Sequence, residues 1–590
     1  MGNGKKTFAK VGAMVMAATS LFSFAGCGFT GDDSNKTHIM IENFGGGVGV
    51  QWLNNAISDF MDYIGDKQYE EGKPVFIEVV RNDTGVHCDN IQSSGSHMFF
   101  FQEPYTKLYN LIQSGAFMEI TDIVRDETLD EFGEVGVTIE SKMDERYRFA
   151  MQGTGDYANK YYMLPGHESY SAVSYDMDLF TEKGFYLAQE GGSFEHTSTL
   201  LNNKKFYFTD LDEEKTVGND GIAGTDDDGM PTTLDEMVAM CEYIKSNGVS
   251  PFSAPGGHID YANHLIEALW TALAGYEQRA AVASLSGRVD WVTGISDEEL
   301  WAGTGIKRPI IAPNQEVTEA TGYKAINQAG RYYAFAFMEL AYQQGWFYDQ
   351  YANPDYNHKS AMRSFVLNGL GDYDFLASHV EGTYWYNEAE SYGLFNDYKT
   401  YSGGKEVKNI GYWHMPTSID GEVVTSEANK REEAATNNYT STAVINGNMD
   451  DRPGNEGKIE LCKDFMKFLY TEKGLRNYTK TTGVPKALMQ YDIMNDEVLN
   501  ELDPYQKTVM RLRANNRIVN QYGDSDMYRN FSTMFVYSVS GPGYAPVVGT
   551  TEFSSILMVF HNKPTENAWT MFTLTGQTDG TWAEKLAQLK

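Results

Sequence analysis

The chain from residue 38 onward alternates short apolar runs with amphipathic segments. Apolar runs of strand length occupy residues 38–44, 74–80 and 98–101. Residues 51–63 and 105–112, which follow the first and third runs, carry apolar side chains at the spacing of one helix face. Strands and helices in this alternation predict a mostly parallel sheet flanked by helices.

Later segments predict further helices that could pack on such a sheet. Thr233 and Glu236 have the spacing of a capping box and place a helix at residues 234–246. Cys241 falls among the apolar positions of that helix, so we interpret it as a core residue. Residues 458–470 predict another long helix, because their apolar side chains again recur at helical spacing.

The first residues predict a targeting segment and not a part of the fold. Three lysines precede an apolar run at residues 11–25, which is short for a membrane span. The run closes on Phe-Ala-Gly-Cys, and Cys27 there resembles the acylated cysteine of a bacterial lipobox. We therefore predict a signal peptide at residues 1–26, lipidation of Cys27 and a polar tether at residues 27–36. The alternative is an ordinary cleaved signal peptide with an incidental cysteine.

Charge and length narrow the function classes. The 590 residues include 81 acidic and 47 basic side chains, a net charge of −34, which argues against nucleic-acid binding. It argues more weakly against an anionic ligand, because a local patch can override the global field. The length predicts at least two lobes. No nucleophile elbow, P-loop or H-E-x-x-H sequence occurs, so we predict neither an enzyme nor a required cofactor.

Six segments carry short patterns in a fixed order. Residues 161–165 read Y-Y-M-L-P, and residues 174–180 read S-Y-D-M-D-L-F. The other segments are strand or helix ends at residues 375–385, 411–416, 464–474 and 482–485. In this order they resemble the family 1 extracellular solute-binding proteins of ABC importers, the branch that includes maltose-binding protein. Asp176 stands where that family usually has Asn.

The resemblance implies a fold class. It is an α/β, two-lobed periplasmic-binding-protein-like fold of type II, with two mostly parallel sheets flanked by helices and joined by a hinge. Residues 37–168 and 430–482 would form lobe one, and residues 169–429 and 483–590 would form lobe two. Ligands of open parallel sheets bind at the C-terminal ends of the strands, which here would face the space between the lobes.

Polar and aromatic residues near the predicted strand ends are candidate ligand contacts. Aromatic rings stack on the apolar face of a pyranose, and amides and carboxylates hydrogen-bond its hydroxyls. The candidate set is Trp52, Gln102, Glu103, His167, Tyr384, Trp385 and Trp413. The alternative for each aromatic residue is core packing, and for Glu103 a helix N-terminus. Adjacent aromatic residues at 384–386 cannot all point inward from one strand, which favours ligand contact there.

One loop, with the sequence G-N-D-G-I-A-G-T-D-D-D-G at residues 218–229, is rich in Gly and Asp. Asp226 and Asp228 fit two positions of a calcium-binding loop, Asp235 falls where the last ligand would be, and Asp220 could supply another. The first position, however, is a glycine where an EF-hand has Asp. Two interpretations remain open, a structural Ca²⁺ site and a solvated acidic loop.

Together these features predict a monomeric solute-binding lipoprotein on the extracellular face of the bacterial cytoplasmic membrane. It would capture an oligosaccharide between two lobes and deliver it to the transmembrane permease subunits of an ABC importer, with the lipid as its only membrane attachment. Two other classes stay open. A secreted, lipid-anchored glycoside hydrolase needs only two suitably spaced carboxylates, and a carbohydrate-binding surface protein could work without a transporter. A peptide cargo also remains open.

Overall fold

The computed structural model describes most of the chain after the predicted leader. The described residues are 35–82, 88–102, 105–256, 261–405, 407–419, 433–437, 441–449, 454–531, 555–574 and 579–589. The predicted signal peptide, the lipidation site Cys27 and the candidate ligand residue Glu103 lie outside these residues. No helix within the described ranges is long and apolar enough to cross a membrane.

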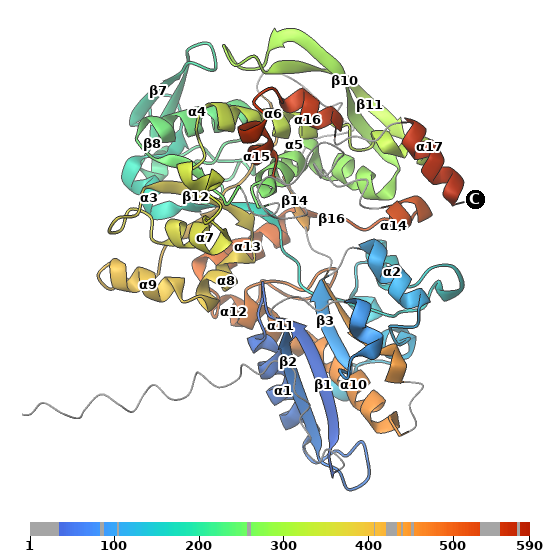
Figure 1. Cartoon of the computed structure of the whole chain (residues 1–590). Coiled ribbons are helices and arrows are strands. Elements are labelled where there is room, and N and C mark those ends of the chain that lie inside the picture. Colours follow the sequence, from blue (N-terminus) through green and yellow to red (C-terminus); the bar gives the residue numbers. More distant parts are fainter. Residues whose placement is uncertain are drawn as a thin grey trace, which may run out of the picture.

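A five-stranded sheet forms the centre of one lobe, which we call lobe one. Its strand order is β2-β1-β3-β15-β4. The strands are β1 (Thr37–Phe44), β2 (Val75–Asn82), β3 (Met98–Gln102), β4 (Leu164–Pro165) and β15 (Ser441–Ile445). Strands β1, β2 and β3 run parallel, whereas β15 pairs antiparallel with both β3 and β4. Helices α1 (Gln51–Ile64), α10 (Glu456–Leu469) and α11 (Glu472–Thr482) pack together on this sheet (Figure 1).

A four-stranded sheet forms the centre of lobe two, with the order β13-β5-β12-β9. The strands are β5 (Ser171–Asp176), β9 (Ser250–Ser253), β12 (Leu376–Gly382) and β13 (Ile410–Tyr412). Only the β12–β9 pair is parallel. Smaller sheets extend this lobe, formed by β6 (Tyr186–Ala188), β7 (Phe194–Ser198) and β8 (Lys204–Thr209), by β10 (Gly287–Glu299) and β11 (Lys307–Val317), and by β14 (Ala434–Asn437) and β16 (Arg517–Asn520).

The remaining helices lie mainly around lobe two (Figure 1). They are α2 (Tyr105–Gln113), α3 (Met177–Lys183), α4 (Leu234–Ser246), α5 (Asn263–Ser284), α6 (Ala329–Gln343), α7 (His358–Val366), α8 (Trp385–Ser391), α9 (Leu394–Tyr401), α12 (Asp496–Leu499), α13 (Pro504–Asn515), α14 (Asp526–Phe531), α15 (Ile556–Asn562), α16 (Ala568–Leu574) and α17 (Asp579–Gln588). Helix α2 belongs to lobe one and contacts α14 from the C-terminal part of the chain.

The α/β fold class with two sheets is confirmed, but the prediction of mostly parallel sheets is wrong. Local patterns identified the β1-α1-β2 unit, whose crossover helix makes the two strands parallel. In lobe one the antiparallel strand is β15, which returns to the sheet after the chain has left this lobe at β4, ending at Pro165. The direction of a strand that returns from another lobe is not encoded in its own hydrophobic pattern.

The individual elements agree closely with those predicted. Thr233 caps α4 by accepting a hydrogen bond from the Glu236 N–H, and the Glu236 carboxylate accepts one from the Thr233 N–H, which completes the predicted capping box. Cys241 is fully buried in the core, as predicted. The predicted helices at residues 51–63 and 458–470 correspond to α1 and α10.

Candidate functional site

A pocket opens where β1 and β3 end, at the edge of lobe one that faces lobe two. It encloses about 330 Å³, part of it continuous with solvent. The turn after β1, the first turn of α1, the segment after β4 and the segment after α11 complete its wall. Its polar lining residues are Asn43, Gln102, His167, Ser441 and Lys486, and its aromatic lining residues are Phe44, Trp52, Phe100, Phe101 and Tyr478. The segment after β4 approaches β15 so closely that a Cβ on Gly166 would lie 2.0 Å from the Ser441 Oγ.

Three of the candidate residues meet in this pocket. Trp52 lies in the first turn of α1, and its ring makes edge contacts with Phe100 and Tyr478 at centroid distances of 5.1 and 5.0 Å. Gln102 is the last residue of β3, and its Nε2 lies 3.0 Å from the Nε2 of His167. Burial lowers the pKa of His167 to about 3, helped by the nearby charge of Lys486. His167 is therefore neutral at pH 7, and its Nε2 accepts a hydrogen bond from the Gln102 amide.

Lys486 and Tyr478 line the same pocket, although sequence patterns did not point to either. Lys486 directly follows the T-G-V-P segment at residues 482–485, which entered the sequence analysis only as one of the six segments that resemble the family. The signal that could have found it is a lysine in an otherwise apolar stretch, V-P-K-A-L-M, because a lysine is almost never fully buried without a functional or structural partner.

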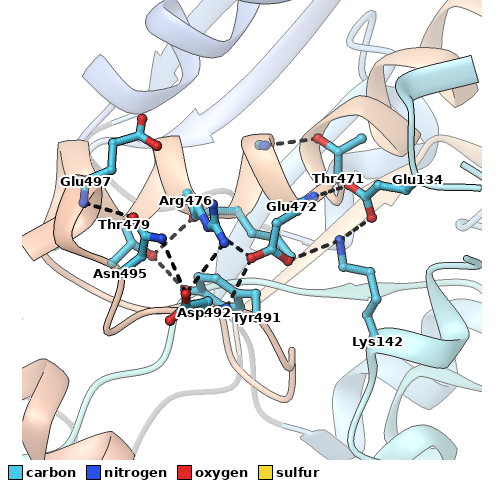
Figure 2. Close-up of polar contacts among 12 residues, drawn as sticks. Glu134, Lys142, Thr471, Glu472, Arg476, Thr479, Tyr491, Asp492, Asn495 and Glu497 are labelled. Atoms are coloured by element: carbon cyan, nitrogen blue, oxygen red, sulfur yellow. Dashed lines mark hydrogen bonds and ion pairs between the residues drawn. The ribbon is translucent and has the colours of Figure 1, made fainter.

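Figure 2 shows a polar network around Tyr491 and Asp492, which follow Lys486 in the chain. The Tyr491 hydroxyl accepts a hydrogen bond from the Lys486 backbone N–H at 2.9 Å and pairs with the Thr479 hydroxyl of α11 at 2.6 Å. The backbone N–H of Asp492 donates to the Glu472 carboxylate at 3.1 Å. These bonds tie the segment to α11 of lobe one, so the backbone position of Lys486 is set before any ligand arrives. The lobe boundaries themselves remain predictions.

Lobe two reaches the edge of the pocket through Glu388 of α8. The Glu388 Oε1 accepts a hydrogen bond of 2.8 Å from the backbone N–H of Gly47, in the turn after β1. Gly47 has a φ of 62°, a conformation that glycine adopts without strain. Burial and the neighbouring Glu381 raise the pKa of the Glu388 carboxyl to about 7, whereas the Gly47 N–H acts in the opposite direction. This contact is one point where the two lobes touch.

The raised pKa of Glu388 predicts a pH-dependent effect on stability. In the unfolded chain a glutamate loses its proton near pH 4.5, but in the folded protein Glu388 keeps it to about pH 7. The free energy of unfolding therefore falls as the pH rises from about 4.5 to about 7, because the buried carboxyl must then lose its proton. We expect Glu388→Gln, which cannot ionise, to raise the free energy of unfolding by about 1–3 kcal/mol at pH 8, and by much less at pH 5.

Urea unfolding at both pH values measures this difference. Glu182→Gln, at an exposed position on α3, is the matched control and should change stability equally little at both. An equal effect of Glu388→Gln at pH 5 and pH 8 would show that this carboxyl does not titrate in the window.

The aromatic candidates of lobe two are buried. Trp385 and Trp413 are both 0% exposed, and Tyr384 is 5% exposed. Trp413 packs against Phe180 and Phe252. Trp385 likewise packs against buried rings, those of Phe365 and His379. We therefore leave both tryptophans out of the proposed site. Ligand contact by Tyr384 stays a prediction.

The reason lies in the secondary structure at this point. Strand β12 ends at Gly382, and residues 385–391 form helix α8 instead of continuing the strand. On a helix, successive side chains point about 100° apart, so neighbouring rings can each enter a different part of the core. Tyr386 stacks on Tyr505 at 5.2 Å, for example. The argument that adjacent rings cannot all be buried held only for a strand.

The carboxylates of the Gly/Asp-rich loop have partners within the protein. Both carboxylate oxygens of Asp226 lie 3.0 Å from the Arg511 Nη1, and Asp228 accepts a hydrogen bond from the Gly224 N–H at 2.6 Å. Asp220 accepts from the Ile222 N–H, and Asp235 lies on α4. Across the described ranges no group of three or more His, Cys, Asp or Glu side chains is placed to hold a metal ion. The calcium interpretation stays a prediction without geometric support.

The two separate sheets define a two-lobed α/β fold, which we compared with known proteins. No protein-family model matches the chain, and no curated protein matches its sequence. Maltose-bound MalE3 of T. maritima aligns with a TM-score of 0.50 at 11% identity, over 92% of this chain and 99% of that protein. The chain therefore has the two-lobed α/β fold of a solute-binding protein.

Other solved structures align over similar lengths. A cyclic alpha-maltosyl-1,6-maltose binding protein from Arthrobacter globiformis aligns at 10% identity over 93% of this chain and 99% of its own, with a TM-score of 0.48. A family 1 extracellular solute-binding protein from Bifidobacterium longum subsp. infantis aligns at 14% identity over 93% and 100%, with a TM-score of 0.44.

Proposed function

We propose that this chain is the extracellular solute-binding component of an ABC importer and captures an oligosaccharide between its two lobes. The observation that carries the proposal is the position of the pocket. It lies at the C-terminal ends of β1 and β3, where lobe one faces lobe two, which is where open α/β sheets bind ligands. The shared fold with a maltose-bound protein supports a sugar as the cargo.

The chemistry of the pocket suits a sugar. Trp52 and Tyr478 offer aromatic surface, and Asn43, Gln102 and Ser441 offer amide and hydroxyl groups. Such a mixture of a few oriented polar groups with aromatic walls is typical of small-molecule sites. An open form would bind the sugar on lobe one, and closure of lobe two, with Glu388 meeting the turn at Gly47, would enclose it.

Transport requires attachment of the protein to the membrane and a permease to which it can deliver the ligand. In the proposed scheme Cys27 carries a lipid that holds the protein on the extracellular face of the cytoplasmic membrane. The closed, loaded form then docks on the permease subunits. Ligand shifts the balance between open and closed forms only by its higher affinity for the closed one.

A thermal-shift screen of the leader-free protein against an oligosaccharide panel tests this function. A ligand that binds only the folded state raises the melting temperature. At a ligand concentration of a hundred times the dissociation constant, it adds about 2.7 kcal/mol to the free energy of unfolding. We expect one glycan class to raise the melting temperature without release of shorter products. Each sample is run with and without Ca²⁺, so that a Ca²⁺-dependent shift would report on the Gly/Asp-rich loop.

Site variants locate the binding. Gln102→Leu removes the amide that bonds His167 and faces the pocket, and we expect it to weaken binding of the identified glycan about tenfold. Gln344→Leu, at an exposed position after α6, is the matched control and should leave the affinity unchanged. Hydrolysis products would instead favour a glycosidase, and no shift with any glycan would contradict the proposal.

A further inference from the structure

Lys486 is a buried cation held in a cage of aromatic rings. Lys486 is only 1% exposed, yet it is one of the residues that line the pocket. The Lys486 Nζ lies 4.2 Å from the ring centroid of Tyr478, 4.8 Å from Trp52, 5.4 Å from Tyr470 and 5.8 Å from Phe100. Rings at these distances orient an ammonium group, but they do not neutralise its charge.

The cage supplies no counter-ion. Within the described ranges no carboxylate forms an ion pair with Lys486, and no group accepts a hydrogen bond from its Nζ. Other buried lysines of this protein do have such partners: Lys408 pairs with Asp176 at 2.5 Å, and Lys142 with Glu134 at 2.9 Å. Burying an unpaired charge is costly, so a protein retains one where something else completes the pair.

We propose that Lys486 binds the carboxylate of an acidic sugar, so that the cargo is a uronic-acid-containing oligosaccharide. This inference rests on the proposed function, whose substrate class it narrows. Ser441 and Gln102 also line this pocket, and their hydroxyl and amide groups can bond the hydroxyls of the sugar ring that bears the carboxylate. A carboxylate fits the site because it brings the single negative charge that the cage lacks.

The net charge of −34 does not oppose this binding mode. Charges on the surface are largely screened beyond about 10 Å at 0.1 M salt, whereas a buried contact is screened much less. A strongly acidic protein therefore needs a sheltered cation to bind an anion, and Lys486 is sheltered by four rings.

The titratable groups around Lys486 predict that binding takes up a proton. Burial lowers the pKa of Lys486 to about 7, so this group changes its charge near neutral pH in the free protein. Of its neighbours, His167 has its pKa lowered to about 3, and burial raises the pKa of both Tyr470 and Tyr478. None of the three changes charge near pH 7. Across the pocket edge Glu388 does, with a pKa of about 7.

Isothermal titration calorimetry of the leader-free protein tests the inference with a matched pair of probes. These are an oligogalacturonate of three or four sugars and its methyl ester, which has the same rings without the charge. An oligomannuronate pair and a sulfated oligosaccharide complete the panel and distinguish a carboxylate from a sulfate. We expect a uronate to bind at least about tenfold tighter than its ester at pH 6. Its dissociation constant should rise by up to about tenfold per pH unit above pH 7.

Variants assign these effects to Lys486. Lys486→Met keeps the length of the side chain and should abolish both the preference for the uronate and the pH dependence, while Lys473→Met, exposed on α11, should change neither. The pH series is repeated in Glu388→Gln, because that carboxyl titrates in the same range. Glu103→Gln is included because Glu103 follows Gln102 in the sequence.

The outcomes separate this inference from the proposed function. Binding of neutral and acidic glycans with equal affinity, or a uronate preference that persists in Lys486→Met, overturns the role of Lys486 and leaves the transport function standing. A preference that emerges only in Glu103→Gln shows that Glu103 and not the cargo neutralises the lysine, and it also overturns the inference. A preference for sulfate assigns the anion to a sulfate ester and contradicts the carboxylate. The absence of binding by every glycan contradicts both proposals.

Discussion

Asp176→Asn is expected to lower the free energy of unfolding by about 3–5 kcal/mol, because it leaves the buried Lys408 without its counter-ion. Asp176 is 3% exposed, and its Oδ2 accepts hydrogen bonds from the Lys408 Nζ at 2.5 Å and from the Asn368 Nδ2 at 2.6 Å. Its Oδ1 caps α3 by accepting from the Leu179 N–H at 3.0 Å. Asparagine preserves the cap, but the amide nitrogen that replaces Oδ2 can accept from neither Lys408 nor Asn368, so the loss reports on both of these contacts.

Two further variants make this prediction specific. Asp176→Asn combined with Lys408→Met removes both charges and should recover most of the lost stability in urea unfolding. Asp178→Asn makes the same change in the first turn of α3, at a partly exposed position, and should cost no more than about 1 kcal/mol. If Asp176→Asn is as mild as Asp178→Asn, the ion pair does not explain why this chain has Asp where the resembling family has Asn.

Trp385→Ala is expected to destabilise the fold by about 3–5 kcal/mol and to leave ligand affinity of the folded protein unchanged. The Trp385 side chain is 0% exposed. Its Nε1–H donates to the Ser174 Oγ at 2.9 Å, and its ring lies 5.2 Å from His379 and 5.6 Å from Phe365. Removing it therefore leaves a cavity in the core of lobe two and takes away one of the two hydrogen-bond partners of the Ser174 hydroxyl, which still donates to Tyr505.

Thermal unfolding and glycan titration of the same preparation distinguish the two roles of Trp385. Tyr401→Ala, which removes an aromatic ring that is 51% exposed, is the control and should change stability by no more than about 0.5–1 kcal/mol. A Trp385→Ala variant that keeps its stability but loses glycan binding would restore the ligand contact expected from the sequence.

Much of the candidate site was visible in the sequence, because it follows from local chain geometry. Gln102 ends the parallel strand β3, and Trp52 follows the parallel strand β1. Such strands end at one edge of a sheet, so the two residues were expected to lie near each other. His167 was among the candidates near predicted strand ends, and the structure places it in the same pocket. Glu103, from the same strand end as Gln102, stays a prediction outside the described residues.

What could not be read from the sequence depends on contacts between distant segments. The rings around Lys486 come from α1, β3, the residue after α10, and α11, and the nearest of these residues in sequence is eight positions away. No window of local periodicity contains this cage. The same holds for Glu388, whose partner Gly47 is 341 positions away.

The sequence by itself determined several elements of this protein, the capping box of α4 and the parallel unit at the start of lobe one. These properties depend on hydrogen bonds and side-chain spacing within a few turns of the chain. Only the tertiary structure decided that the later strands run antiparallel, that Trp385 and Trp413 belong to the core, and that Lys486 reaches the pocket. Burial and charge pairing are set by which segments pack together in space, and that packing depends on the whole chain and not on any local pattern.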